Sequence, residues 1–439
     1  MKQKVLSITL FLLCCIVSFG YDGMVITTYL PDVGSITIMV ISEEEKTCQI
    51  GNGSDLAIES NGFSGNIEIP SNIAGYTPIS IGNKAFADCY AVKKISIPNS
   101  VVAIGREAFF RCFNMESLYL PSSVRQIGNG AFQRAKIQKI IIDDFDSWTK
   151  IDFESYDSNP FSIAKSIYIG NGQVTEIVIP NTLTEIKPYS FEVLAGVKKV
   201  TVPSSIQKIG KNAFANSSIE QVHISSIGDW CKIDMEDESS NPFYCNATLD
   251  VVTDLYVGNE RVTNITIPDN ITTIKPYTFS KLCSVSSLTL SSSLKTIESS
   301  AFSRSNIEKC YINSLEDWCS IDFADASSNP LNSYGVLYEN GNALSEIVVP
   351  SSVTNIKPYT FYGLILKGLT LHSGINHLSK EIIKEGFPYG ITYIKSEMTV
   401  PIDIDDDVFP NDVLANTILY VPDDCQTAYY NKSNWNKFA

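Results

Sequence analysis

The segment ISIPNSVVAIGREAFFRC occupies residues 95–112, and its pattern returns 23 residues later as LYLPSSVRQIGNGAFQRA at 118–135. Each copy has apolar residues two apart, then a proline, then an Ile-Gly-x-x-Ala-Phe motif. Alternating aliphatic residues that end at a proline predict a short strand. A single unit of this length cannot bury its own apolar side chains, so the repeat predicts a β-rich solenoid of stacked coils with a continuous core.

A phenylalanine recurs at one position of the repeat as far as Phe361, and its spacing shows that some coils are longer. Intervals of 23 residues separate Phe86, Phe109 and Phe132, and longer intervals of 59 or 65 residues interrupt the series that continues to Phe361. The longer intervals contain a Trp-x-x-Ile-Asp segment and an Asn-Pro pair, which predict a turn of helix followed by a tight turn. Asn171-Gly172 then predicts a type I′ hairpin turn.

At these motifs the chain resembles the BspA-like leucine-rich repeat family, whose units read approximately as x-I-P-x-S-V-x-x-I-G-x-x-A-F-x-x-C. The resemblance implies a right-handed superhelix of ~23-residue coils with longer Trp/Asn-Pro inserts. It also implies an exported Bacteroides-type protein that acts in adhesion to host proteins or other cells.

Four segments are expected along the chain. Lys2 and Lys4, an apolar run and Ser18-Phe19-Gly20 predict a signal peptide over residues 1–20, cleaved near Gly20. Residues 21–66 are expected to form a β-rich N-terminal cap, residues 67–395 the solenoid, and residues 396–439 a C-terminal cap. The chain is expected to be secreted or held at the cell surface, with the periplasm left open, and to be a monomer without a transmembrane segment.

Charge excludes two classes of partner. The chain carries 33 basic and 48 acidic residues, a net charge of −15. Phosphate backbones and anionic lipids would repel such a chain, so neither nucleic acid nor a membrane surface is expected as a partner.

Cysteines beyond the leader do not form a recognisable disulfide framework. Cys89 and Cys112 follow a repeat phenylalanine by three residues, where other coils have Ala135, Ser217 or Ser305. A site that accepts these types is a small buried slot. Stacking at strand spacing would nevertheless place Cys89 and Cys112 within bridging range, so a disulfide between them stays open.

No catalytic or metal-binding residues are predicted, no cofactor is expected, and the protein is expected not to be an enzyme. The three histidines, His223, His372 and His377, fit no zinc or triad spacing, and His223 is expected to face solvent. Asp152, Asp234 and Asp322 recur after the tryptophans, where an Asp more often caps a turn or helix than binds calcium.

The strand phase predicts which side chains face outward. If the two repeat aliphatics of each strand point inward, the residues between them line a continuous outer sheet face. We therefore expect a protein or cell-surface partner to bind, as an adhesin does, across a row of outward residues: Tyr119, Ile141, Val178, Thr201, His223, Thr266, Thr289, Tyr311 and Val348.

A second hypothesis uses the insert tryptophans. Trp148, Trp230 and Trp318 could stack on sugar rings if they were exposed, in a surface or periplasmic protein of a polysaccharide-handling system. Their place in a fixed Trp-x-x-Ile pattern favours packing against the coil instead.

Overall fold

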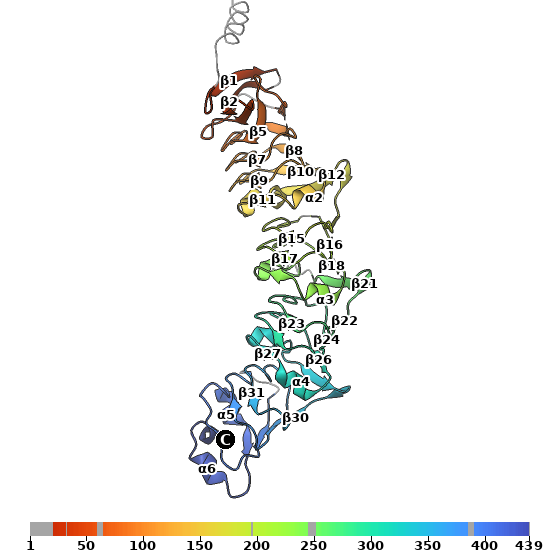
Figure 1. Ribbon diagram of the computed structural model, residues 1–439, viewed down its shortest axis with the longest axis vertical. Coiled ribbons are helices and arrows are strands. Elements are labelled where there is room, and N and C mark those ends of the chain that lie inside the picture. Colours follow the sequence, from red (N-terminus) through yellow and green to blue (C-terminus); the bar gives the residue numbers. More distant parts are fainter. Residues whose placement is uncertain are drawn as a thin grey trace, which may run out of the picture. The chain divides into compact units, whose positions relative to one another are not determined.

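The structure is a computed structural model that describes residues 21–31, 33–58, 65–194, 196–244, 252–384 and 390–438. The predicted signal peptide therefore lies outside the described residues. The chain divides into two compact units, Met1–Val174 and Thr175–Ala439, and each is a β-solenoid (Figure 1). The predicted fold class is confirmed.

Each coil of the first unit supplies one strand to each of two sheets. The longer strands pair in parallel as β4 (Gly65–Glu68), β6 (Val92–Ser96), β8 (Met115–Leu120), β10 (Ile137–Ile142) and β12 (Ala164–Ile169), and antiparallel β13 (Gly172–Gln173) ends the sheet. The return segments pair as β5 (Thr77–Ile81), β7 (Ala103–Ile104), β9 (Gln126–Ile127) and β11 (Asp152–Phe153).

Antiparallel strands precede the first coil. They are β1 (Val25–Leu30), β2 (Gly34–Ser42) and β3 (Thr47–Ile50), and β3 then pairs in parallel with β5. The antiparallel hairpins thus continue the return-side sheet directly, and β3 covers the backbone edge that β5 would otherwise expose.

The second unit repeats this plan in three longer-strand sheets. These are β14 (Glu176–Val178), β16 (Lys199–Val202), β18 (Gln221–Ile224), β20 (Asp254–Val257) and β21 (Glu260–Arg261); β22 (Asn264–Thr266), β24 (Ser287–Thr289), β26 (Lys309–Ile312), β28 (Val336–Glu339) and β29 (Asn342–Ala343); and β30 (Glu346–Val348), β32 (Gly368–Leu371), β34 (Tyr393–Ser396) and β35 (Ile418–Tyr420).

The return-side sheets of this unit are shorter. They comprise β15 (Glu185–Ile186), β17 (Lys208–Ile209) and β19 (Asp234–Met235); β23 (Thr273–Ile274), β25 (Thr296–Ile297) and β27 (Asp322–Phe323); and β31 (Asn355–Ile356) with β33 (His377–Leu378). Beyond them lie α5 (Asn411–Asn416), α6 (Gln426–Tyr430) and the 3₁₀ turn η5 (Trp435–Lys437).

The prediction of a continuous outer sheet face is wrong. Within the second unit, antiparallel β21 and β29 each end one sheet, and the chain then starts another at β22 and β30. Among the described strands, each of these short strands pairs with one neighbour only, and β22 and β30 pair with no strand of the preceding sheet. The outer surface is therefore a set of separate faces.

Each insert is itself a coil. After its longer strand it carries a short helix, namely α2 (Phe145–Trp148), α3 (Ile227–Trp230) or α4 (Leu315–Ser320). After its return strand come 3₁₀ turns, namely η1 (Tyr156–Ser158) and η2 (Pro160–Ser162), η3 (Glu238–Ser240) or η4 (Ala326–Ser328). The helices start at a polar cap, because the side chains of Asp144, Ser226 and Ser314 accept a backbone N–H three residues on. The predicted turn of helix is confirmed.

The hairpin after the first insert turns one residue earlier than predicted. Ile169 pairs with Gly172, so the turn residues are Gly170 and Asn171 rather than Asn171 and Gly172. Of these two residues, Gly170 has a positive φ of 58°, which the turn requires at its first position.

A column of phenylalanine rings forms the core of each unit. Phe86, Phe109 and Phe132 stack at 5.5 and 5.2 Å between ring centroids, and Phe279 stacks on Phe302 at 5.3 Å. The backbone follows the same register, since Phe109 N–H donates to the Ala131 carbonyl at 2.7 Å. Ring stacking and backbone pairing together fix the spacing of the coils.

Both cysteines of the open pair are free thiols. Cys89 and Cys112 are buried, and the Cys112 Sγ–H donates to the Phe86 carbonyl at 3.2 Å. Burial raises the pKa of the Cys89 thiol to about 12. Both side chains therefore act as small core residues.

At Gly105 the backbones of consecutive coils approach too closely to leave room for a side chain. A Cβ at this position would lie 2.6 Å from the Asn83 nitrogen and 2.7 Å from the Gly82 carbonyl carbon of the preceding coil. Gly105→Ala is expected to lower the free energy of unfolding by about 1–3 kcal/mol, because backbone must move. Urea unfolding measures this.

Gly172→Ala is the matched control in the same unit. Its nearest neighbour would be the Ile169 oxygen at 3.6 Å, an ordinary contact, so the change should stay within about 0.5 kcal/mol. Equal losses for the two variants would contradict the close approach at Gly105.

Candidate functional site

The outward residues predicted from strand phase fall into register on separate faces. In the first unit Tyr119 lies beside Ile141. In the second unit the rows are Val178, Thr201 and His223 on one sheet, Thr266, Thr289 and Tyr311 on the next, and Val348 beside Thr370 on the last.

Exposure differs along these rows. Val178 and Val348 lie on the first strands of their sheets and are 57% and 65% exposed. Tyr119, Ile141, Thr201, Thr289 and Tyr311 are half-buried, and Thr266 is exposed. Two of the faces thus have an exposed aliphatic residue at one edge, and the residues further along each row are partly covered.

His223 does not face solvent as predicted. Only 8% of the residue is exposed, its Nδ1 lies 2.6 Å from the Gly258 carbonyl oxygen, and its ring stacks on Tyr256 at 4.5 Å. The hairpin β20–β21 supplies both contacts, so the insert covers a position that strand phase alone leaves open.

A recurring tyrosine on the outer faces escaped the sequence interpretation. It is Tyr168, Tyr256, Tyr338 or Tyr420, each on the last parallel strand of its sheet. These residues are 88, 82 and 82 apart, and the tryptophans show the same two intervals, which was the available signal. Sequence reasoning missed it because the longer coils were treated as inserts rather than as coils with an outward strand residue.

Each of these tyrosines contacts a neighbouring side chain. The Tyr338 ring lies 4.9 Å from that of Tyr311, and the Lys139 ammonium lies 3.8 Å from the Tyr168 ring centroid. Tyr420 meets Tyr393 edge to face at 5.8 Å and is 53% exposed. Such contacts hold each ring in one orientation and leave part of it open to solvent.

Tyr119 belongs to a polar network at the end of β8. Its hydroxyl donates to Asp143 at 2.9 Å, and the Ser122 N–H donates to the other carboxylate oxygen at 2.8 Å. Burial opposes ionisation of Asp143, but hydrogen bonds from Ser122 and Tyr119 outweigh it and lower the pKa of the carboxyl. Burial and the same hydrogen bond raise the pKa of Tyr119 to about 12.

The insert tryptophans cannot stack on a sugar. Trp148, Trp230 and Trp318 are at most 1% exposed. The indole N–H of Trp230 donates to the Thr278 carbonyl, and that of Trp318 donates to the Thr360 carbonyl, each at 2.8 Å. The glycan-stacking alternative for these residues is wrong, because all three rings are buried, and those of Trp230 and Trp318 bind their inserts to the next coil.

Buried asparagines of the Asn-Pro pairs serve the same purpose. Asn241 Nδ2 donates to the Tyr277 carbonyl at 2.6 Å, and Asn329 Nδ2 donates to the Tyr359 carbonyl at 2.8 Å. Both acceptors lie in the Ile-Lys-Pro-Tyr segment that follows an insert. This contact explains why the two motifs occur together.

The repeated aspartates do not cap helices as predicted. Asp234 and Asp322 lie on β19 and β27 and form ion pairs with Lys275 and Lys357 of the next coil, the second at 2.6 Å. Asp152 occupies the equivalent place on β11. Across the described ranges, no group of three or more His, Cys, Asp or Glu side chains is placed to bind a metal ion.

These features define a leucine-rich repeat β-solenoid with outward aromatic faces. The family model for the BspA type leucine rich repeat region matches residues 54–160, 161–234, 253–385 and 332–410, with six copies. Since these ranges cover well over half of the chain, the protein belongs to this family. No match is found among curated proteins.

The chain is similar to several solved structures. A leucine rich cell surface protein from Faecalibacterium prausnitzii is 16% identical, with 92% of this chain and 97% of that chain covered and a TM-score of 0.38. The pneumococcal vaccine antigen PcpA is 19% identical, with 94% and 98% covered and a TM-score of 0.44. A leucine-rich repeat protein from Bacteroides ovatus is 15% identical, with 92% and 100% covered and a TM-score of 0.37.

The hydrogen bonds to Asp143 should make part of the protein's stability depend on pH. Asp143→Asn should lower the free energy of unfolding by about 1 kcal/mol at pH 7, because both donors lose an ionised acceptor and the amide offers them only one oxygen. A lowered carboxyl pKa stabilises the fold above the unfolded value of about 3.9, and this stabilisation is lost as the pH falls through the folded value. Urea unfolding should therefore show a smaller difference between the variant and the wild type at pH 3 than at pH 7.

Glu116→Gln on β8, the strand that carries Tyr119, is the control. Glu116 is 65% exposed on its side chain and pairs with Lys93 at 3.2 Å, a surface ion pair that contributes less than about 1 kcal/mol. A loss for Asp143→Asn that persists unchanged at pH 3 would contradict the role of the ionised carboxylate.

Proposed function

We propose that the protein is an exported, non-enzymatic surface protein that binds a protein or cell-surface partner through its outer sheet faces. The partly exposed tyrosine at one position of each face carries this proposal. Aromatic side chains are enriched among residues that contribute most to binding, because a ring buries a large apolar area at low entropic cost.

Rigidity supports the same proposal. Tyr256 is held by His223 and Tyr338 by Tyr311, and both pairs stand on strands whose inward residues are buried. A preformed surface loses little side-chain freedom when a partner binds. The two exposed valines, Val178 and Val348, extend the apolar area at the starts of their sheets.

We also propose that the protein is secreted or displayed at the cell surface. The predicted leader ends near Gly20, and none of the described helices is long and apolar enough to cross a membrane. We propose that the chain acts as a monomer without cofactor and that the family membership reflects a cell-surface role.

Binding to immobilised extracellular-matrix proteins and to intact epithelial cells tests the proposal. The purified chain should bind at least one of these surfaces, and Tyr338→Ala should weaken that binding about tenfold or more, as expected for a central aromatic contact. Surface plasmon resonance and cell-binding assays measure the effect.

Tyr430→Ala is the matched control. Tyr430 is 76% exposed but lies on α6, off the sheet faces. A binding role for the outer faces would be refuted if the chain bound none of the matrix proteins or cells. It would also be refuted if Tyr338→Ala and Tyr430→Ala changed the binding equally.

A further inference from the structure

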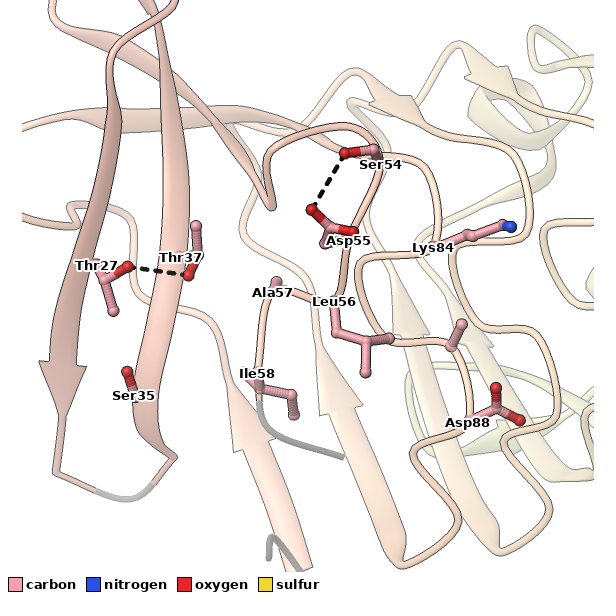
Figure 2. Close-up of a pocket in the computed structure, with 11 residues that line it drawn as sticks. Thr27, Ser35, Thr37, Ser54, Asp55, Leu56, Ala57, Ile58, Lys84 and Asp88 are labelled. Carbon is pink, nitrogen blue, oxygen red and sulfur yellow. Dashed lines mark hydrogen bonds between the residues drawn. The ribbon is translucent and has the colours of Figure 1, made fainter. Parts of the chain in front are cut away.

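The first unit contains a cleft that is lined by no residue of its outer sheet face. Its volume is about 610 Å³, and it lies between the β1–β2 hairpin, the turn at residues 54–58 and the corner of the first coil at Lys84 to Asp88 (Figure 2). No residue of β4, β6, β8, β10 or β12 lines it. The cleft is thus a different site from the one proposed above.

Hydroxyl and charged groups line this cleft on three sides. Thr27, Ser35 and Thr37 come from the hairpin, with the Thr27 and Thr37 hydroxyls 3.2 Å apart, whereas Lys84 and Asp88 come from the coil (Figure 2). Ser54 and Asp55 lie on the turn, and apolar residues complete the lining: Leu56, Ala57, Ile58 and Ala87.

Asp88 connects the cleft to an exposed aromatic pair. It accepts a hydrogen bond from the Tyr90 hydroxyl at 2.6 Å and lies 3.6 Å from the Arg111 guanidinium. The Tyr90 ring stacks on Phe113 at 5.4 Å with 9° between the planes. Both residues are well exposed, at 40% and 38%, although aromatic side chains usually bury their rings.

We infer that this cleft, with Asp88 and the Tyr90–Phe113 pair at its margin, binds an uncharged oligosaccharide. A carboxylate held by a tyrosine and an arginine accepts hydrogen bonds from sugar hydroxyls, and the threonine and serine hydroxyls can donate or accept. An exposed ring offers an apolar face to the C–H side of a pyranose. The volume falls within the range of about 300–1,000 Å³ typical of small-ligand sites, which is too small for a folded partner.

Charge favours an uncharged ligand over an anionic glycan. The chain carries a net charge of −15, and the cations nearest the cleft are already paired, Lys84 with Glu107 at 3.5 Å and Arg111 with Asp88. An anionic glycan would therefore meet overall repulsion without a free cluster of positive charge.

A glycan array of neutral and anionic oligosaccharides, probed with the full chain, tests the inference. Binding to neutral glycans should appear and persist at about 1 M NaCl, where the screening length is only about 3 Å. Isothermal titration with the best neutral glycan should then show at least a tenfold loss for Asp88→Asn and for Tyr90→Ala.

Controls separate this site from folding and from the outer faces. Asp88 has a φ of 56°, which asparagine tolerates, so Asp88→Asn should keep the wild-type thermal midpoint. Tyr156→Ala, at another exposed tyrosine of the same unit, and Tyr338→Ala on an outer face should leave glycan affinity unchanged.

Three outcomes would overturn the inference. They are no binding to neutral glycans, binding to anionic glycans alone, and neutral-glycan binding that survives both Asp88→Asn and Tyr90→Ala. Failure of the outer-face proposal leaves this test unaffected, because the two sites share no residue.

Discussion

Parallel pairing of consecutive coils, with one phenylalanine stacked on the next, is the constraint on which the rest of the structure depends. Phe86, Phe109 and Phe132 occupy one column, and the same register pairs Ser96 with Tyr119 and Tyr119 with Ile141 on the outside. Because the rings are buried and the backbone is hydrogen-bonded between coils, outward side chains have fixed neighbours.

The longer coils modify this constraint without breaking the core. Trp230 and Asn241 both bind the backbone of the Lys-Pro-Tyr-Thr segment that follows, and Lys275 of that segment returns an ion pair to Asp234. The hairpins that end these coils divide the outer surface into separate faces and place a tyrosine on each. Separate outer faces that carry such a tyrosine are thereby repeated along the second unit.

The sequence predicted the coil, the buried phenylalanines and the outward phase of residues such as Thr201 and Thr289, because strand and repeat periodicities depend on local side-chain alternation. It did not predict the burial of His223 or the interruption of the sheets, because both depend on where the β20–β21 hairpin packs. The cleft beside Asp88 also escaped it, since residues more than 50 positions apart line that site.

Disulfide trapping of register tests the stacked-coil account most directly. Thr266 on β22 pairs with Thr289 on β24, whereas Ser287 lies two residues before Thr289 and pairs with Asn264. In a Cys283→Ser background, Thr266→Cys with Thr289→Cys should oxidise readily, because paired strands bring Cα atoms within the bridging range of about 4.4–6.8 Å. Thr266→Cys with Ser287→Cys should oxidise much more slowly, and equal rates for the two pairs would contradict the register.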